Sequence, residues 1–273
     1  MSTTTVAAKL PARQTRRLRR PRLVSAELLK LRKRRGLVLS SLALTVLPMV
    51  IAYTVLLMVH ASNPDKHGPA GGLKNFTNSM DLLTTLGGIA AILIGATLGA
   101  GDLGSGVFRE LVVTGRSRLA LYAARIPAGL AFVWAVVGVG FAITATSSVV
   151  FAGSLEAPSA TLLAKSAAWL ALATALALFL ALGVSSLVGA RGTTIGVVLG
   201  WQLVAMPLLT NIKELGSLRQ ALSEAGVRRL QPDALFNGGP TVTMSLAAAL
   251  VVVAAWTIVP LAFGARRTVT RDA

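Results

Sequence analysis

Long apolar stretches separated by short polar segments are the main feature of this 273-residue sequence. Six stretches of eighteen or more residues carry little or no charge, and they run over residues 37–59, 82–100, 126–151, 166–188, 193–210 and 241–263. A hydrocarbon core about 30 Å thick needs about 20 helical residues, so each stretch is long enough to cross a membrane. Lipid offers the backbone no hydrogen-bond partner, and the alternating pattern of a membrane β-barrel is absent. The pattern therefore predicts an all-α integral membrane protein with six transmembrane helices in a domain of residues 37–264.

Composition supports a membrane protein, and the placement of charge indicates its orientation. Hydrophobic residues make up 54% of the chain and charged residues 14%, which is less charge than a soluble domain of this length carries. The net charge is +17, and a cytoplasmic amino terminus would place 20 of the 27 lysines and arginines on the cytoplasmic side. Cytoplasmic loops are enriched in these residues. We therefore expect a multi-pass protein of the cell membrane with both termini in the cytoplasm and a basic tail at residues 265–273.

The segment ahead of the first apolar stretch divides into two parts. Residues 1–22 are polar and basic, and we expect this tail to be disordered. Residues 23–36 predict a short amphipathic helix that lies in the membrane interface. Its apolar face carries Val24, Leu28 and Leu31, and its charged face carries Glu27, Lys30 and Arg34. Anionic lipid head groups attract such segments, whereas the aromatic readers expected for nucleic-acid binding are absent here, so we expect lipid and no nucleic acid as a partner.

A glycine-rich stretch after the second apolar segment raises the question of nucleotide binding. Gly99, Gly101 and Gly104 fit the dinucleotide fingerprint G-x-G-x-x-G. That fingerprint requires a preceding strand and an acidic residue about 20 positions on, but here an apolar helix precedes the glycines and residues 123–125 include no acid. The phosphate-binding pattern G-x-x-x-x-G-K-[ST] is also missing, so we expect this chain to bind no ATP.

The same stretch instead predicts a helical hairpin on the cytoplasmic side, between the second and third spans. Its apolar residues share one face of a short helix, its Arg-Glu dipeptide lies on the other faces, and a glycine ends the helix before the turn. The positions that define it are Asp102, Phe108, Arg109, Glu110, Leu111, Gly115 and Arg118. The apolar face has to bury against the membrane surface or a soluble partner.

Two glycine patterns predict close contacts between helices. Gly95 and Gly99 form a small-residue pair at the end of the second span. Gly192, Gly196 and Gly200 form a smooth stripe on the fifth span. Such a stripe suits either a seam between two subunits or a contact within one subunit, and the sequence leaves both open.

The two outer segments with the clearest patterns differ in character. Residues 60–81 are rich in Asn, Gly and Pro and predict a flexible connector. Residues 215–231 predict an amphipathic outer helix, in which Glu224 precedes Arg228 by four positions, the favourable order for a helical ion pair.

Residues suited to catalysis or metal binding are scarce. Cysteine is absent, and His60, Asp65 and His67 in the first outer segment have no metal-ligand spacing. The charged residues nearest the apolar stretches all fall at their ends: Asp81, Asp102, Lys165 and Arg191. A carrier driven by an ion gradient usually keeps an ionisable group at mid-membrane depth. We therefore predict no catalytic residues, no metal site and no cofactor bound by this chain.

Three stretches resemble the membrane permease subunits of ABC-2-type exporters. The first, SAELLKLRKRRGLVLS (residues 25–40), is similar to the elbow helix that leads into the family's first span. The second, GATLGAGDLGSGVFRELVVTGRSRLALYAARI (residues 95–126), resembles the exit from span two, with Asp102 where the family often has Glu. The third, VRRLQPDALFNG (residues 227–238), is similar to the Pro-containing stretch before the last span.

The resemblance implies the permease subunit of an ATP-driven exporter. It implies a second permease copy or a homologous permease as partner, and two ATP-binding-cassette ATPase subunits that bind ATP and Mg. The helix around residues 106–114 would couple to those ATPases, and the elbow residues would be Glu27, Leu28, Lys30 and Leu31. The residues alone also leave open a membrane assembly or signalling protein without transport activity, and, less favoured, an ion-coupled carrier.

Overall fold

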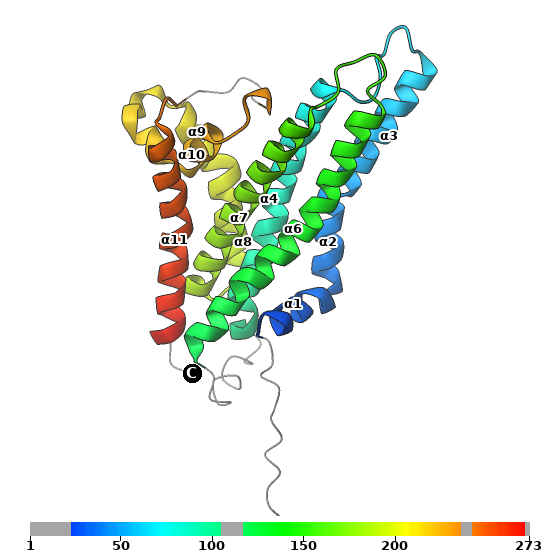
Figure 1. Cartoon of the computed structure of the whole chain (residues 1–273). Helices are drawn as coiled ribbons and strands as arrows, with labels where there is room; N and C mark the ends of the chain where they lie inside the picture. Colours follow the sequence, from blue (N-terminus) through cyan, green and yellow to red (C-terminus); the bar gives the residue numbers. More distant parts are fainter. Residues whose placement is uncertain (1–22, 105–116, 236–241, 271–273) are drawn as a thin grey trace, which may run out of the picture.

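The computed structural model describes residues 23–104, 117–235 and 242–270, and the secondary structure of these residues is helical (Figure 1). The α-helices are α1 (Leu23–Lys33), α2 (Arg35–Thr45), α3 (Leu47–Ser62), α4 (Leu73–Gly104), α6 (Arg118–Val150), α7 (Ala160–Val188), α8 (Arg191–Gly200), α9 (Met206–Asn211), α10 (Ser223–Arg229) and α11 (Leu246–Thr270). The shorter helical segments are the π-helical η1 (Trp201–Ala205) and the 3₁₀-helical η2 (Lys213–Ala221) and η3 (Asp233–Leu235). The all-α prediction is confirmed for the described residues. The predicted tail at residues 1–22 lies outside them, and most of the tail predicted at 265–273 belongs to α11.

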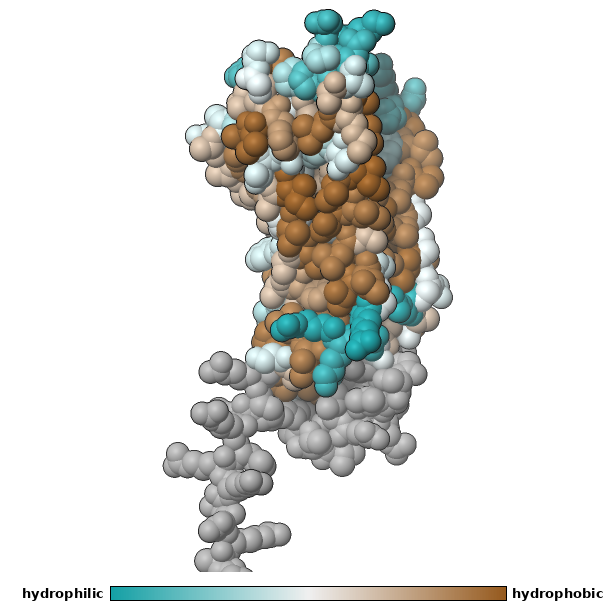
Figure 2. Space-filling view, turned by 90° about the vertical axis from the view of Figure 1, so that its right-hand side faces the viewer, coloured by the Kyte–Doolittle hydropathy of each residue, from teal (hydrophilic) through white to brown (hydrophobic). Residues whose placement is uncertain are grey.

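Six helical segments are long and apolar enough to cross a membrane, which confirms the prediction of six spans. They are Arg35–Ser62, Leu73–Gly101, Arg118–Val150, Ala160–Val188, Arg191–Asn211 and Leu246–Thr270. Figure 2 shows an apolar band over the middle of one face, with hydrophilic residues gathered above and below it. A band of this kind matches the hydrocarbon layer of a bilayer, with polar ends in the head groups.

The helices extend well beyond the apolar stretches that predicted them. α4 begins at Leu73, nine residues before the predicted start, and α6 begins at Arg118, so Pro127 lies inside α6. The 32 residues of α4 span about 48 Å at 1.5 Å per residue, which exceeds a hydrocarbon core of about 30 Å. Its ends therefore project into polar surroundings, where polar side chains carry no penalty and hydropathy does not mark the helix.

The pair α4 and α7 forms the centre of the bundle, with α11 packed on α7 and α2 packed on α4 (Figure 1). Gly95 faces α7 so closely that a Cβ there would lie 2.5 Å from the carbonyl oxygen of Leu178. Gly99 faces Ser185, whose Oγ donates a hydrogen bond to the carbonyl oxygen of Gly95 at 3.3 Å. The small-residue pair predicted from the sequence therefore lies at a close crossing of two spans.

The first span consists of α2 and α3 with a break at Val46. Pro48 has no N–H, so it leaves the carbonyl of Leu44 without its usual helical donor. The amide of Val46 still donates to the carbonyl of Leu42 at 2.8 Å, so the chain keeps its direction through the break. α1 ends at Lys33, slightly earlier than the predicted end of the interfacial helix.

The connection between α3 and α4, the first outer segment of the sequence analysis, is tied to the carboxyl-terminal end of α6, which corrects the prediction of a flexible connector over residues 60–81. The amide of Gly71 donates to the carbonyl of Phe151 at 2.7 Å, and that of Gly72 donates to Ser148 at 2.8 Å. Gly72 has a φ of 87°, a conformation that favours glycine. These hydrogen bonds join segments far apart in the sequence, so composition alone does not indicate them.

The outer segment before the last span is broken, and the prediction of one amphipathic helix over residues 215–231 is wrong in this respect. Gly216 interrupts η2 with a φ of 52°, and Leu222 is extended between η2 and α10. The predicted ion pair does form within α10, where Nη2 of Arg228 lies 2.7 Å from Oε1 of Glu224.

Tryptophan side chains anchor this outer segment against the spans. Nε1 of Trp169 on α7 donates to the carbonyl of Val227 at 3.0 Å, and Nε1 of Trp256 on α11 donates to that of Ala221 at 2.8 Å. The ring of Trp256 also stacks on that of Trp201, with centroids 5.8 Å apart. As a result α10 is held next to α7 and α11, at the end of the bundle opposite α1 (Figure 1).

Candidate functional site

The two helices that flank the predicted coupling hairpin meet at the lower end of the bundle in Figure 1. α4 ends at Gly104 and α6 begins at Arg118, where Ser117 caps the helix by accepting a hydrogen bond from the amide of Ala120 at 3.2 Å. Several predicted coupling residues fall outside the described part of the chain, as does the side chain of Asp102. They are Phe108, Arg109, Glu110, Leu111 and Gly115.

A buried arginine joins the two flanking helices. Arg125, the eighth residue of α6, is 1% exposed, and its Nη1 donates to the carbonyl oxygen of Gly99 on α4 at 3.3 Å. The sequence analysis left Arg125 just outside the third predicted span, which begins at residue 126. The signal that could have identified it is a single cation followed at once by a long apolar run, since a charge buried at such a position is retained only with partners.

α1 packs against α6. Leu31 is buried in the core and Leu28 packs against it, as their place on the predicted apolar face requires. Glu27, which the sequence placed on the charged face, is instead buried, and its Oε1 lies 2.8 Å from Nζ of Lys30. A carboxylate can be buried on α1 because the adjacent ammonium group compensates its charge.

The guanidinium of Arg34 packs against the end of α4. The nearest atom to a Cβ placed on Gly101 is Nη2 of Arg34, at 3.0 Å. The segment between α1 and α2 therefore contacts the same helix end that leads into the hairpin.

The start of α6 is also joined to the last span. Nη1 of Arg118 donates to the carbonyl of Val269 at 3.0 Å, and the hydroxyl of Tyr122 donates to that of Leu261 at 3.1 Å. Gly264 leaves room for the Tyr122 ring, since a Cβ there would lie 2.8 Å from its hydroxyl oxygen. Arg118 is thus the one predicted coupling residue whose side-chain contacts are described, and it links α6 to α11.

The glycine stripe of α8 faces away from the rest of the subunit. Gly192, Gly196 and Gly200 are all exposed, and a Cβ on any of them would have nothing within 4 Å among the described residues. Thr194 and Val198 form the buried side of the same helix. A contact within one subunit, the second of the two explanations of the stripe, is therefore not formed by the described residues.

No group of three His, Asp or Glu side chains that could hold a metal ion occurs within residues 23–104, 117–235 and 242–270. Nδ1 of His60 lies 2.6 Å from the carbonyl oxygen of His67, so this pair of histidines is engaged locally. Asp81 and Lys165, which the sequence places at the ends of apolar stretches, lie inside helices because α4 and α7 begin before those stretches. Asp81 lies about 12 Å along α4 from its first residue.

The lower end of the bundle is therefore an assembly of helix ends tied by hydrogen bonds and charged side chains.

Residues 23–209 match the model of a protein family described as ABC-2 family transporter protein, which covers more than half of the chain. No curated protein matches the chain.

Proposed function

This chain belongs to the ABC-2 family of transporter membrane proteins, and we propose that it is the permease of an ATP-binding-cassette exporter, coupled to separate ATPase subunits through the segment between α4 and α6. The family supplies the membrane component of such transporters rather than the ATPase, and it works with ATP-binding-cassette partners. Two ATPase subunits would dock below the hairpin, and ATP with Mg would be bound and hydrolysed there.

The observation that best supports this coupling is the hydrogen bond from Arg125 to Gly99. It joins the two helices that flank the hairpin, so a push on the hairpin would move α4 and α6 together. α4 is in turn packed closely on α7, and α6 is joined to α11 through Tyr122. Nucleotide binding in the partner would then bias two arrangements of the spans.

Coupling is tested with a reporter on the opposite side of the molecule. The chain has no cysteine, so one cysteine at the exposed Lys213 of the outer segment can be labelled selectively by a maleimide. In the complex with the ATPase that co-purifies, ATP should change the labelling rate in the parent. Arg109→Ala or Phe108→Ala should abolish that change while the complex and its membrane level persist.

Lys66→Ala, at an exposed position of the first outer connection, is the matched control for the loss of a basic residue. It should leave the response to ATP intact. An unchanged response in both hairpin variants would refute the coupling role. A protein that recruits no ATPase at all would favour the assembly or signalling alternative.

Orientation can be measured with the same cysteine-free background. We expect a cysteine at Asp65, exposed in the first outer connection, to react with a membrane-impermeant maleimide on intact cells. A cysteine at Arg266, exposed near the end of α11, should react only after the membrane is permeabilised. The reason is the excess of basic residues on the side of α1 and the carboxyl terminus. The reverse labelling pattern would overturn the proposed topology.

A second copy of the permease is proposed to pack on the glycine stripe of α8. Gly196→Leu should leave the subunit folded, because nothing within 4 Å obstructs the new side chain, but it should prevent two backbones from approaching. We expect chemical cross-linking in membranes to give dimers of the parent and monomers of this variant. Gly138→Leu on α6, which also has open space around its Cβ, is the matched control and should cross-link as the parent does.

A further inference from the structure

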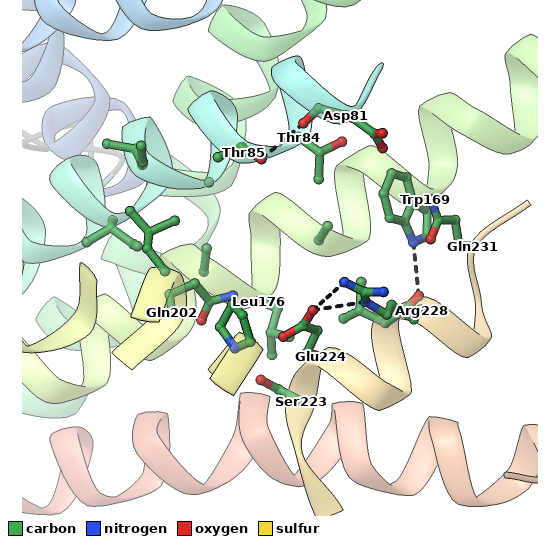
Figure 3. A pocket seen from close by; sticks show the side chains of 18 of the residues that line it. Asp81, Thr84, Thr85, Trp169, Leu176, Gln202, Ser223, Glu224, Arg228 and Gln231 are labelled. Atoms are coloured by element: carbon green, nitrogen blue, oxygen red, sulfur yellow. Dashed lines mark hydrogen bonds and ion pairs between the residues drawn. The ribbon is translucent and has the colours of Figure 1, made fainter. Parts of the chain in front are cut away.

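A cavity of about 560 Å³ lies between α4, α7, the π-helical turn η1 and α10 (Figure 3). Its volume is in the range of sites for small molecules, and its upper wall is the anchored outer segment described above. None of the predicted coupling, elbow or seam residues lines it. Its chemistry is therefore separate from the lower end of the bundle.

Polar side chains gather at one end of the cavity. Asp81 and Thr84 of α4 lie across from Glu224 and Arg228 of α10 in Figure 3. Glu224 is held by two contacts from Arg228, at 2.9 Å from Nε and 2.7 Å from Nη2. The hydroxyl of Thr210 lies 3.5 Å from the other carboxylate oxygen of Glu224. These contacts fix the wall formed by α10 before any ligand arrives.

The charged side chains that line the cavity sum to a net charge opposite in sign to that of the whole protein. The chain has 27 basic and 10 acidic residues, yet the charged side chains that line the cavity are the two carboxylates of Asp81 and Glu224 and the single guanidinium of Arg228. The sum is a formal charge of −1, at an end of the cavity where Asp81 is exposed. A negative wall favours a cation and disfavours an anion, whatever hydrogen bonds each carboxylate also makes.

The other end of the cavity is apolar. Ile89 and Ile92 of α4 face the cavity together with Leu176 and Ala177 of α7. Because Asp81 and Ile92 are eleven residues apart on one helix, the polar and apolar ends are separated by about 16 Å. That separation matches a ligand with a polar head and an apolar tail.

The helix that closes the side of the cavity is locally widened. Pro207 cannot donate to the carbonyl of Leu203, and the amide of Met206 bonds instead to Trp201, five residues back. Gln202, Leu203 and Pro207 of this segment line the cavity. Single π-helical turns occur frequently at functional sites, where they direct side chains and free carbonyl groups.

From these features we propose that the cavity binds a small amphiphile with a positively charged head group, and that such molecules are the class of cargo. The head lies between Asp81 and Glu224, and the tail lies along α4 and α7. The assignment as cargo rests on the proposed transport function, whereas binding itself does not.

The test uses dansylcadaverine, a fluorescent alkylamine that is protonated at neutral pH, and its neutral N-acetyl derivative. Binding to the full chain in nanodiscs, without any ATPase, is followed by the increase in dansyl fluorescence. The parent should bind the amine roughly tenfold more tightly than the acetylated form, because one charge contact near a protein surface is worth on the order of 1 kcal/mol or more. Asp81→Asn should remove most of this preference and leave the Kd of the acetylated form within about twofold.

A second variant fills the cavity. Gly88 lines it, and a Cβ there would have nothing within 4 Å, so Gly88→Leu can place its side chain in the space without displacing a neighbour. It should weaken binding of both probes roughly tenfold or more. Gly138→Leu is the control for Gly88→Leu, and Asp65→Asn is the control for Asp81→Asn. Both control positions lie away from the cavity, so both variants should bind the two probes as the parent does.

Two results would overturn the proposal. Equal affinity of the parent for the two probes would refute selection of a cation, and normal binding by the Gly88 variant would place the probe elsewhere. Nanodiscs with and without ethanolamine phospholipid identify the source of the amine. If the probe binds more weakly to nanodiscs that contain ethanolamine phospholipid, the natural ligand is a lipid head group. If binding is unchanged, the natural ligand is a free amphiphile. If the ATP-dependent labelling test fails while the parent still binds the charged probe selectively, only the coupling to ATP is refuted, and the proposed binding site stands.

Discussion

Gly95→Ala should lower the thermal stability of the protein much more than Gly88→Ala on the same helix. A Cβ on Gly95 would lie 2.5 Å from the carbonyl oxygen of Leu178 and 2.9 Å from Cβ of Ala181. The first of these is a backbone atom inside α7, so the two central helices have to separate. Overpacking of this kind costs about 1–3 kcal/mol, which exceeds the gain of about 0.5–1 kcal/mol from replacing a helical glycine.

The measurement is the midpoint of thermal unfolding of both purified variants in the same detergent. We expect Gly95→Ala to unfold roughly 3–10 °C below the parent, and Gly88→Ala to unfold at or above it. Gly88 has open space around its Cβ, so only the gain in helix propensity remains. Equal midpoints for the two variants would contradict the close crossing of α4 and α7.

The six spans could be predicted because hydropathy reports what the hydrocarbon layer requires of each helix. The helix ends could not, and α4 shows why. Its first nine residues, LKNFTNSMD, include six polar or charged side chains and have the composition of a loop. This part of α4 extends beyond the hydrocarbon layer, so hydropathy does not report it. The backbone hydrogen bonds of Gly71 and Gly72 to the end of α6 fix the start of the helix.

The sequence predicted the contacts at the lower end only in part. Periodicity placed Leu28 and Leu31 on the buried face of α1, because apolar burial is the signal that periodicity carries. It failed for Glu27, since the burial of a carboxylate depends on Lys30 and on α6 lying beside it. Likewise, the glycines of α4 predicted a close approach, but only the fold identifies α7 as the helix that approaches.

The outer cavity could not be predicted for a similar reason. Its two carboxylates come from residues 143 positions apart, on α4 and α10. The indole hydrogen bonds of Trp169 and Trp256 hold α10 near the spans, and neither bond leaves a local pattern in the sequence. The ion pair of Glu224 and Arg228 was predictable because both residues belong to one helical turn.

Arg125→Met should disconnect the hairpin from the spans while leaving the protein folded. The substitution removes the donor to Gly99, a hydrogen bond from a charged group worth about 1.5–3 kcal/mol. It also removes the cost of burying a guanidinium, which is several kcal/mol in proteins. The two terms oppose each other, and methionine has an unbranched chain that can fill the space, so we expect the free energy of unfolding to change by no more than about 1 kcal/mol.

For coupling, in contrast to stability, no second term offsets the loss of the hydrogen bond between Arg125 and Gly99. Without the guanidinium, α4 and α6 can move independently where they leave the hairpin, and a push from the ATPase is not shared between them. In the Lys213 cysteine background, the ATP-dependent change in labelling rate should fall roughly tenfold, about 1.4 kcal/mol of lost coupling free energy. Arg191→Met, at an exposed position on the same side of the molecule, should keep the full response. If Arg125→Met unfolds the protein, or if its response to ATP stays normal, the role of Arg125 in transmission is refuted.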